Sequence, residues 1–329
     1  MGRHLRRHPG DATGDLHPRR RQRHEGCAAG QHRRDEHVEL LPGEECPPGG
    51  VTDLVARELA KRITEAFGQA CTVENKAGAG GNIGTAALAR SSPDGYTLGV
   101  MTVSAISIAP HVTPNLPFNP EKDFTPITNI VNTPGALLAG IKTPFQSIPD
   151  LIRAAKERPG KITYASVGNG SLPHLVGERF CKTFGVDLVH VPYKGAAPAM
   201  QDLLAGVVDL SFESALTNTV SNAAAGKLRV LATTGSQRAP VLANVPTLHE
   251  IHPGFIAQGW FGLLGPAGLP ESVVAKVHAV AISMLKEGPL LERFEKLGIE
   301  ADPRTPQSFR SYLAEQSLIW ANVAKSLKI

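Results

Sequence analysis

Pro-Pro-Gly-Gly-Val-Thr-Asp, over residues 47–53, is the first of three glycine-rich loops that decide the fold of this chain. The other two read Gly-Ala-Gly-Gly-Asn-Ile-Gly over Gly78–Gly84 and Gly-Asn-Gly-Ser over Gly168–Ser171, and each loop leads directly into a helical pattern. A helix N-terminus presents unpaired backbone N–H groups and a partial positive charge, so it suits an anion. Glycine keeps those N–H groups accessible, because it has no side chain to hold a ligand away. The three loops therefore predict a pocket that holds negatively charged groups largely with backbone.

Length and composition predict a soluble, globular protein of two domains. At 329 residues the chain is longer than one hydrophobic core usually organises, and 42% of its residues are apolar without a run long enough to span a membrane. The net charge of +4 is too small to predict a nucleic-acid partner. The cysteines, Cys27, Cys46, Cys71 and Cys181, show no zinc-site spacing, and we interpret them as unpaired thiols. We expect no metal and no cofactor.

Residues 1–45 differ in composition from the rest of the chain. They hold nine arginines and six of the 12 histidines but no Lys, Ser, Asn, Ile or Phe, and they show no helical or strand periodicity. Eight acidic residues nearly cancel the arginines, which argues against a basic arm for nucleic acid. No apolar segment of the length that a secretory signal needs is visible. We expect this segment to be disordered, and we interpret it as the product of a wrong start or reading frame that joins the real protein near Cys46.

From Pro47 onward, predicted helices and strands alternate, which indicates α/β architecture with mostly parallel sheets and helices on both faces. The first helix, with Thr52 or Asp53 as its cap, ends at Gly68. The apolar run from Phe124 to Ile141 and the later run Phe261–Leu264 read as two crossings between lobes. We therefore expect a bilobed protein with a cleft between its lobes, in which residues 46–130 and 258–329 form lobe 1 and residues 131–257 form lobe 2.

Several ordered motifs together resemble one known family. Besides the first loop, they are Val-Glu-Asn-Lys-Ala-Gly-Ala-Gly-Gly-Asn-Ile-Gly (Val73–Gly84), Pro-Asp-Gly-Tyr-Thr-Leu (Pro93–Leu98), Tyr-Ala-Ser-Val-Gly-Asn-Gly-Ser-Leu-Pro-His-Leu (Tyr164–Leu175), Val-Pro-Tyr-Lys-Gly-Ala-Ala-Pro-Ala (Val191–Ala199) and Trp-Phe-Gly-Leu-Leu-Gly-Pro-Ala-Gly (Trp260–Gly268). From about Pro47 to the C-terminus, the chain resembles the substrate-binding proteins of tripartite tricarboxylate transporters, the TctC-like or Bug-type family.

The resemblance implies a type II periplasmic binding protein fold and a receptor without enzymatic activity. Such a receptor captures a small organic acid, such as a di- or tricarboxylate, an aromatic acid or an acidic amino acid, and delivers it to the membrane permease subunits of the transporter. The family also implies a periplasmic location, although this chain shows no signal peptide, and we expect a monomer. The residues expected to bind the ligand are Gly49, Gly50, Thr52, Asp53, Gly78, Ala79, Gly80, Gly81, Asn82, Thr102, Ser104, Ser166, Gly168, Asn169, Gly170, Ser171, His174, Tyr193, Lys194, Gly195, Pro198, Phe212 and Glu213.

Some of these residues have a second interpretation. Asp53 either only caps its helix or also faces the ligand, where it would favour an amine or a protonated acid. His174 either donates to the ligand or supports the first turn of its helix, and Lys194 either contacts the ligand or is solvated. Tyr193 and Phe212 either pack against an aliphatic ligand or belong to the core.

The chain departs from the family pattern in two places. The family has an apolar strand just before the first loop, whereas this chain has Glu-Leu-Leu-Pro-Gly-Glu-Glu-Cys over Glu39–Cys46, so the central strand of lobe 1 is in doubt. Family members commonly carry Asp after the strand that ends at Phe212, whereas this chain has Glu213, a longer acid that would alter the cleft.

Nucleotide binding, catalysis and metal binding are less favoured interpretations of these motifs. The loop Gly78–Gly84 lacks the third glycine of a dinucleotide fingerprint and the Gly-Lys-Ser/Thr of a P-loop. Ser171, His174 and Glu178 share a helix face but lack an evident nucleophile–base pair with an oxyanion site, so we expect Ser171 to cap its helix. His174, Glu178 and nearby Cys181 lack a fourth metal ligand.

Two other classes of function stay open. An enzyme on the same bilobed scaffold would need a general acid or base in the cleft, and none is convincing. An effector-sensing domain of a transcription regulator, with residues 1–45 as its DNA arm, would need a helix-turn-helix pattern that this arm lacks.

Overall fold

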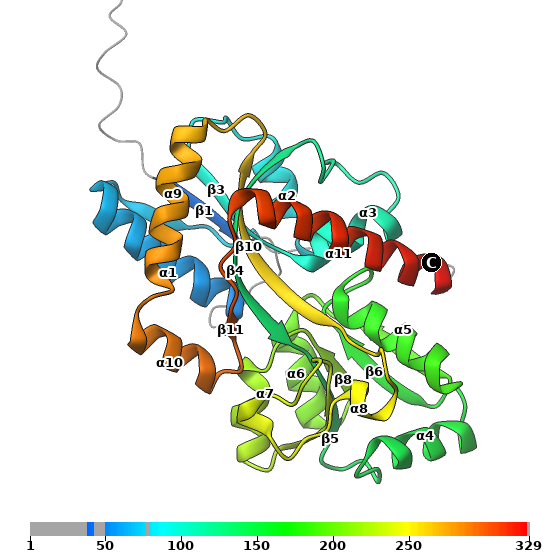
Figure 1. Ribbon diagram of the computed structural model, residues 1–329. Helices are drawn as coiled ribbons and strands as arrows, with labels where there is room; N and C mark the ends of the chain where they lie inside the picture. The colour runs from blue at the N-terminus through cyan, green and yellow to red at the C-terminus, as the bar shows by residue number, and fades with distance from the viewer. Residues whose placement is uncertain (1–37, 43–49, 77–78, 328–329) are drawn as a thin grey trace, which may run out of the picture. The chain divides into compact units, whose positions relative to one another are not determined.

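The computed structural model describes residues 38–42, 50–76 and 79–327, which form two β-sheets flanked by helices (Figure 1). The expectation of disorder for residues 1–37 and 43–45 lies outside these residues. No helix in the described ranges combines the length and the apolar composition that crossing a bilayer requires.

The first sheet has six strands in the order β11-β4-β10-β3-β1-β2. Its strands are β1 (Val38–Pro42), β2 (Cys71–Val73), β3 (Thr97–Thr102), β4 (Phe124–Pro134), β10 (Gln258–Pro266) and β11 (Glu300–Ala301). The helices and turns that accompany it in the chain are α1 (Val51–Phe67), a 3₁₀ turn (Ala79–Gly81), α2 (Asn82–Ala89), a π-helical turn (Ser104–Ile108), α3 (Ala109–Val112), α9 (Glu271–Met284), α10 (Gly288–Lys296) and α11 (Pro306–Leu327).

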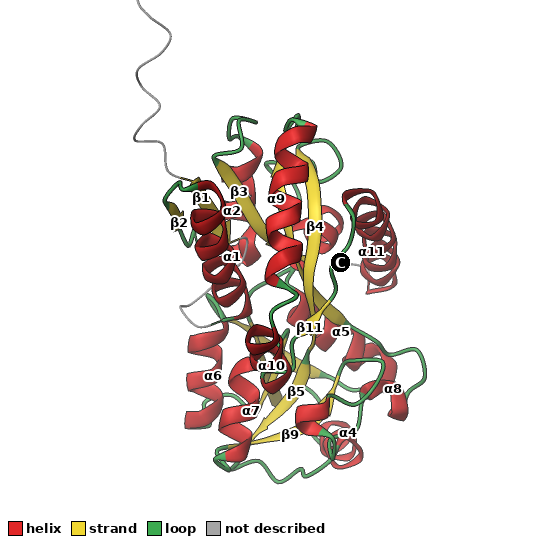
Figure 2. Ribbon diagram, turned by 60° about the vertical axis from the view of Figure 1, so that its left-hand side comes forward, coloured by secondary structure: helices red, strands yellow, loops and turns green. Residues whose placement is uncertain are grey.

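The second sheet has five strands in the order β7-β6-β8-β5-β9. Its strands are β5 (Ala136–Gly140), β6 (Ile162–Ser166), β7 (Leu188–Pro192), β8 (Leu210–Glu213) and β9 (Leu228–Thr233). Helices α5, α6 and α7 pack around this sheet (Figure 2). The accompanying helices are α4 (Ile148–Glu157), α5 (Leu172–Phe184), α6 (Ala196–Ala205), α7 (Thr217–Ala224), a 3₁₀ turn (Pro240–Leu242) and α8 (Leu248–Ile251).

Two long strands connect the sheets. Strand β4 leads through Gly135 directly into β5, and β10 pairs antiparallel with β4 from Gln258 opposite Pro134 to Pro266 opposite Phe124. The predicted α/β fold class is confirmed, but each sheet is mixed rather than mostly parallel. The reason is that the connecting strands enter as antiparallel neighbours: β4, β10 and β11 pair antiparallel in the first sheet, and β5 pairs antiparallel with β8 and β9 in the second.

Strand β1 corrects one prediction from the sequence. Residues Val38–Pro42 belong to the segment expected to be disordered, yet they form a strand parallel to both β2 and β3, with Leu40 opposite Leu98. Val38 and Leu40 are buried in the hydrophobic cluster beneath α1, while Leu41 is buried in the other large cluster. Three apolar side chains in five residues were enough to complete the sheet, so the doubt about this central strand is resolved.

The ends of two helices show which local signals decide their position. Helix α1 begins at Val51 with Gly50 as its N-cap, so neither Thr52 nor Asp53 caps it as expected. Its C-terminal end is at Gly68, which adopts φ of 66°, as the sequence predicts. Helix α5 begins after Ser171, whose hydroxyl accepts a hydrogen bond from the His174 N–H, and this cap confirms the prediction.

We predict that Leu40→Ala destabilises the protein by about 2–5 kcal/mol, because it leaves a cavity in a core where Leu40 is fully buried. Urea unfolding followed by circular dichroism measures this change. The matched control is Leu318→Ala on α11, where the side chain is 65% exposed and truncation should cost at most about 0.5 kcal/mol. Equal unfolding midpoints for the two variants would contradict the placement of β1 in the core.

Candidate functional site

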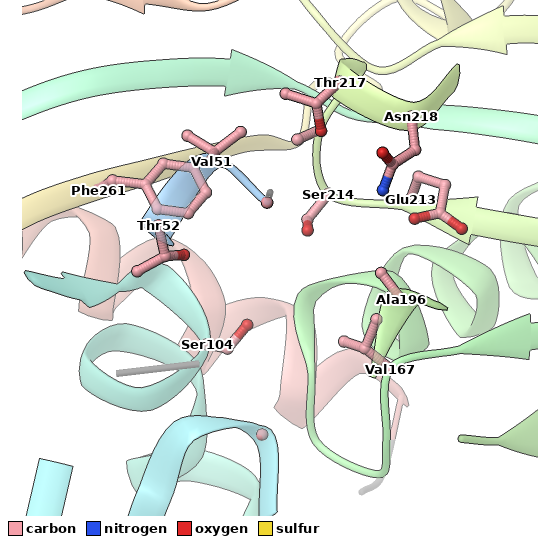
Figure 3. A pocket seen from close by; sticks show the side chains of 13 residues that line it. Val51, Thr52, Ser104, Val167, Ala196, Glu213, Ser214, Thr217, Asn218 and Phe261 are labelled. Carbon is pink, nitrogen blue, oxygen red and sulfur yellow. The ribbon is translucent and has the colours of Figure 1, made fainter. Parts of the chain in front are cut away.

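A cavity lies between elements of the two sheets (Figure 3). Its volume is about 50 Å³. A single water occupies roughly 10–15 Å³ of such cavity volume. The cavity can therefore hold several waters, or a small molecule in their place. The lining residues are Gly50, Val51, Thr52, Gly80, Ser104 and Phe261 from the first sheet's elements, and Val167, Ala196, Glu213, Ser214, Ala215, Thr217 and Asn218 from the second sheet's elements.

The N-termini of three helices open onto this cavity. Val51 and Thr52 begin α1, Ala196 begins α6, and Thr217 and Asn218 begin α7. None of these three helices has a side-chain cap. Within the described ranges, the backbone N–H groups of these five residues have no hydrogen-bond acceptor. The cavity is therefore rich in unpaired donors that carry the positive end of a helix dipole.

Side chains add hydroxyl and amide groups but almost no charge. Thr52 and Ser104 lie on one side of the cavity, and Ser214, Thr217 and Asn218 lie on the other (Figure 3). No Arg or Lys side chain is among the described lining residues, and Glu213 is their one ionisable group. A bound anion would thus be held by dipoles rather than by a counter-ion, and this arrangement avoids burying a cation.

Glu213 ends β8 and is held in place by its neighbours. Alternation along the strand places Ser211 and Glu213 on one face and Phe212 on the other, and the Ser211 hydroxyl donates to Glu213 Oε1 at 2.7 Å. Glu213 is 9% exposed. Burial raises the pKa of its carboxyl to about 7, and the hydrogen bond from Ser211 opposes that rise. This carboxyl can therefore exchange a proton near neutral pH.

The crossing strands position the loop that follows Glu213. The Thr133 hydroxyl on β4 donates to the Ser214 carbonyl oxygen at 2.8 Å. A Cβ atom on Gly259 of β10 would approach the same carbonyl oxygen to 3.1 Å, and one on Gly135 would approach the Glu213 carbonyl oxygen to 2.2 Å. Because Gly135 and Gly259 have no side chain, the connecting strands β4 and β10 can approach the backbone of Glu213 and Ser214 closely.

Ser214, Ala215, Thr217 and Asn218, at the start of α7, were missed by the sequence analysis. A signal was present, because Ser214 directly after a strand, with Thr217 and Asn218 close behind it, is typical of a helix start. Val51, Val167 and Ala196 lie in predicted loops but were not singled out, and Phe261 was missed, since an apolar side chain gives no hint that its backbone lines a cavity.

The third glycine-rich loop contributes less than the sequence predicts. Val167 lines the cavity, but Gly168, Asn169 and Gly170 are not among the lining residues. The start of α5 is already satisfied, because Ser171 caps it and the Leu172 N–H donates to Ser104 Oγ at 3.2 Å. An N-terminus whose donors are used in this way has little left for an anion.

Ser166 and His174 belong to a packed group behind this loop. Ser166 Oγ lies 2.6 Å from His190 Nε2, and the His174 and His190 rings stack at 4.2 Å between centroids. Burial lowers the pKa of His174, and burial together with His174 lowers the pKa of His190 to about 4. Glu178 accepts a hydrogen bond from the Tyr164 hydroxyl at 2.6 Å. His174 and Ser171 thus have structural roles here, and neither lines the cavity.

Residues near α6 and β8 divide between surface and core. Lys194 is exposed, Gly195 is the N-cap of α6, and Pro198 lies in the first turn of that helix. The Tyr193 hydroxyl donates to Asp202 at 2.7 Å. Phe212 is 1% exposed and packs edge-on against Tyr164 at 5.4 Å between ring centroids. Of the two interpretations of Phe212, its burial supports the core, because strand alternation turns this ring away from the face of Ser211 and Glu213.

Asp53 is bound by a cation outside the cavity. Its carboxylate lies 2.8 Å from Arg57 Nη2 and accepts from Asn75 Nδ2 at 3.3 Å. It lines a neighbouring hollow between α1, α7 and α10. The residue is therefore not a cap, and it is not among the lining residues of the cavity.

Among the described residues of the second loop, 79–84, Gly80 alone lines the cavity. Ala79 begins the 3₁₀ turn, and Gly81, with φ of 91°, is the N-cap of α2. Asn82 Oδ1 and Thr102 Oγ1 are buried without a hydrogen-bond partner in the described part of the chain, and neither residue lines the cavity. Gly49 and Gly78 lie outside the described residues.

We predict that Glu213→Gln raises the thermal unfolding temperature at about pH 8 and leaves it nearly unchanged at about pH 5. Because the folded state raises the pKa of Glu213 from 4.5 to about 7, the stability from its protonation is complete below the ordinary pKa and is lost as pH rises through about 7. At 1.36 kcal/mol per pKa unit, the loss is on the order of 3 kcal/mol, and glutamine cannot incur it.

Thermal unfolding by circular dichroism at both pH values measures this effect. The control is Glu157→Gln at an exposed position, which should not change the difference between the two pH values. An equal shift for Glu213→Gln at both pH values would show that this carboxyl is not buried as described.

Comparisons with known proteins show which family and fold the chain shares. The family model described as the tripartite tricarboxylate transporter family receptor matches residues 55–329. The periplasmic binding protein BugD has 35% sequence identity and a TM-score of 0.83, over 89% of this chain and 97% of BugD. Rpa4515 from R. palustris, solved with adipate, has 32% identity and a TM-score of 0.84, over 89% of this chain and 97% of that protein. MatC from Rhodopseudomonas palustris, solved with bound malate, has 30% identity and a TM-score of 0.81, over 87% of this chain and 98% of that protein.

These comparisons confirm the resemblance read from the motifs, and they confirm the predicted periplasmic binding protein fold. The family model describes a receptor, and BugD is a binding protein, so the relatives bind solutes and are not enzymes. The chain belongs to the tripartite tricarboxylate transporter receptor family.

Proposed function

We propose that this protein is an extracytoplasmic receptor that binds a small carboxylate in the cavity and delivers it to the permease of a tripartite tricarboxylate transporter. The observation that carries the proposal is the convergence of three uncapped helix N-termini on a cavity whose described lining has no cationic side chain. Relatives of the same family were solved with adipate and malate, and both ligands are dicarboxylates. A periplasmic location is part of the proposal and is supported by the periplasmic relative BugD.

Backbone donors supply enough free energy for a transport receptor. A hydrogen bond to a charged group contributes about 1.5–3 kcal/mol net, and micromolar binding needs roughly 8 kcal/mol. The five N–H groups that have no acceptor within the described ranges, with the hydroxyls of Thr52, Ser104, Ser214 and Thr217, can reach that value after the losses of association. The result is reversible capture, which a receptor needs in order to release its cargo.

The ligand would also hold the two sheets' elements together. Helix α1 belongs to the first sheet, and α6 and α7 belong to the second, so an anion that accepts from all three gains contacts only when they are close. Among the described residues, direct hydrogen bonds already join the two sets of elements at the cavity, from the Leu172 N–H to Ser104 Oγ and from the Thr133 hydroxyl to the Ser214 carbonyl oxygen. The ligand-held arrangement is the form that the permease would recognise.

We predict that a panel of C4–C6 dicarboxylates, tricarboxylates, aromatic acids and acidic amino acids contains a ligand that raises the unfolding temperature. A ligand at about 100 times its dissociation constant stabilises the folded state by roughly 2.7 kcal/mol, and a thermal-shift assay detects that change. The uncharged amides of the same acids are the control and should not stabilise. If no acid stabilises the protein, the proposed function is wrong.

We predict that Ala196→Pro weakens carboxylate binding by roughly 10- to 150-fold, because it removes one donor N–H that is worth about 1.5–3 kcal/mol. Proline is well tolerated at the first position of a helix, so α6 should still form. Isothermal titration calorimetry gives the affinity, and circular dichroism checks the fold.

The matched control for this variant is Glu271→Pro, at the first position of α9 and away from the cavity. It should bind the acid as the unmodified protein does. Unchanged affinity in a folded Ala196→Pro variant would contradict recognition by the start of α6.

A further inference from the structure

Glu213 lines an otherwise uncharged cavity, and only one oxygen of its carboxyl accepts a hydrogen bond in the described ranges. Ser211 Oγ donates to Oε1, whereas no donor in the described ranges reaches Oε2. Glu213 is the one ionisable residue among the described lining residues, and no Arg or Lys stands beside it there. In the proposed receptor, the carboxyl of Glu213 would therefore lie beside the carboxylate of the ligand.

Two carboxylates cannot share this space as anions. Like charges in an enclosed site repel, and one of the two groups then keeps a proton. A protonated carboxyl changes from an acceptor to a donor, because its O–H can donate to an acceptor oxygen. Protonation of Glu213 needs little free energy near neutral pH, since burial already raises its pKa to about 7. The ligand's carboxylate needs donors, and a protonated Glu213 would supply one more.

We propose that the cavity binds its carboxylate together with one proton, which Glu213 Oε2 carries and donates to a ligand oxygen. The inference rests on the proposed function and deepens it, because it makes the transported species an acid anion plus one proton taken from solvent. It also makes Glu213 a specificity-determining residue, which favours a ligand that offers an acceptor at this point over one that offers an ammonium group.

In the described ranges, no cationic side chain contacts the Glu213 carboxyl. On β6 and α5, which pack against β8, the Tyr164 hydroxyl donates to Glu178. On β5, the paired residue is Ala136, and α7 carries no titratable side chain. On α6, the carboxylate of Asp202 accepts from the Tyr193 hydroxyl. Arg229 on β9 donates to the Phe145 carbonyl oxygen. On α1, Asp53 is paired with Arg57 in the neighbouring hollow.

Proton uptake on binding predicts the direction in which the ligand affinity changes with pH. Above about pH 7, free Glu213 is ionised and must gain a proton when the ligand binds, so affinity should fall by up to tenfold for each unit of pH. Well below that pH the residue already holds the proton, so this contribution to the pH dependence disappears. A ligand that instead donated an ammonium group to an ionised Glu213 would bind more tightly as pH rises.

The test is isothermal titration calorimetry of the full chain with L-malate and with adipate between about pH 6.5 and pH 9. At about pH 8, titrations in phosphate and in Tris, which differ in ionisation enthalpy, count the protons taken up. The expected result is close to one proton for each ligand and an affinity that falls with pH. Flat or rising affinity, or no proton uptake, would overturn the inference while leaving carboxylate binding intact.

The variant Glu213→Gln separates the titration from the hydrogen bond, because its amide still donates but cannot ionise. It should bind either probe without proton uptake and with an affinity that does not change over this pH range. Glu157→Gln, the exposed control, should keep the pH dependence of the unmodified protein. If Glu213→Gln keeps it too, another group carries the proton and the inference fails. If neither probe binds at any pH, the inference is overturned for these dicarboxylates, whereas the proposed function is overturned only if the whole panel of acids also fails to stabilise the protein.

Discussion

The antiparallel pairing of β4 with β10 is the constraint on which the site depends. These strands run together over the whole of β10, and β4 then leads directly into the second sheet through Gly135. Their backbone ladder fixes where the second sheet's elements stand relative to α1. It also reaches the site itself, because Thr133 on β4 binds the Ser214 carbonyl oxygen. Without this pairing, nothing in the backbone would hold the N-terminus of α1 close to those of α6 and α7.

The cavity is lined by backbone N–H groups at helix starts, which in many helices donate to a capping side chain. Helix α5 shows the usual solution, in which Ser171 caps the first turn and Ser104 accepts from Leu172. Helices α1, α6 and α7 have no such cap, and free N–H groups are costly unless solvent or a ligand satisfies them. The same feature that leaves these helix ends incomplete makes them a receptor for an anion. Glu213 then adds the one titratable group, so charge in the site is set by protons rather than by fixed cations.

Much of the fold was predictable because its signals are local. The helix ending at Gly68, the cap at Ser171 and the crossing after Phe124 all follow from nearby residues. Strand β1 was missed because its apolar residues sit in a segment of unusual composition, and only pairing with β2 and β3 reveals it. The site was predicted in part. Gly50, Thr52, Gly80, Ser104 and Glu213 line the cavity, whereas Phe212 belongs to the core and Asp53 faces a neighbouring hollow.

The sequence by itself determined the family, the α/β class and the positions of the glycine-rich helix starts, because motifs and caps act over a few residues. Only the tertiary structure decided which helix starts face one cavity. Gly168–Ser171 are not among the residues that line this cavity, whereas Thr217 and Asn218, which lie far from the first loop in the chain, are. The physical reason is that a free N–H group is a local property, whereas the convergence of several such groups depends on strand pairing across more than a hundred residues of sequence.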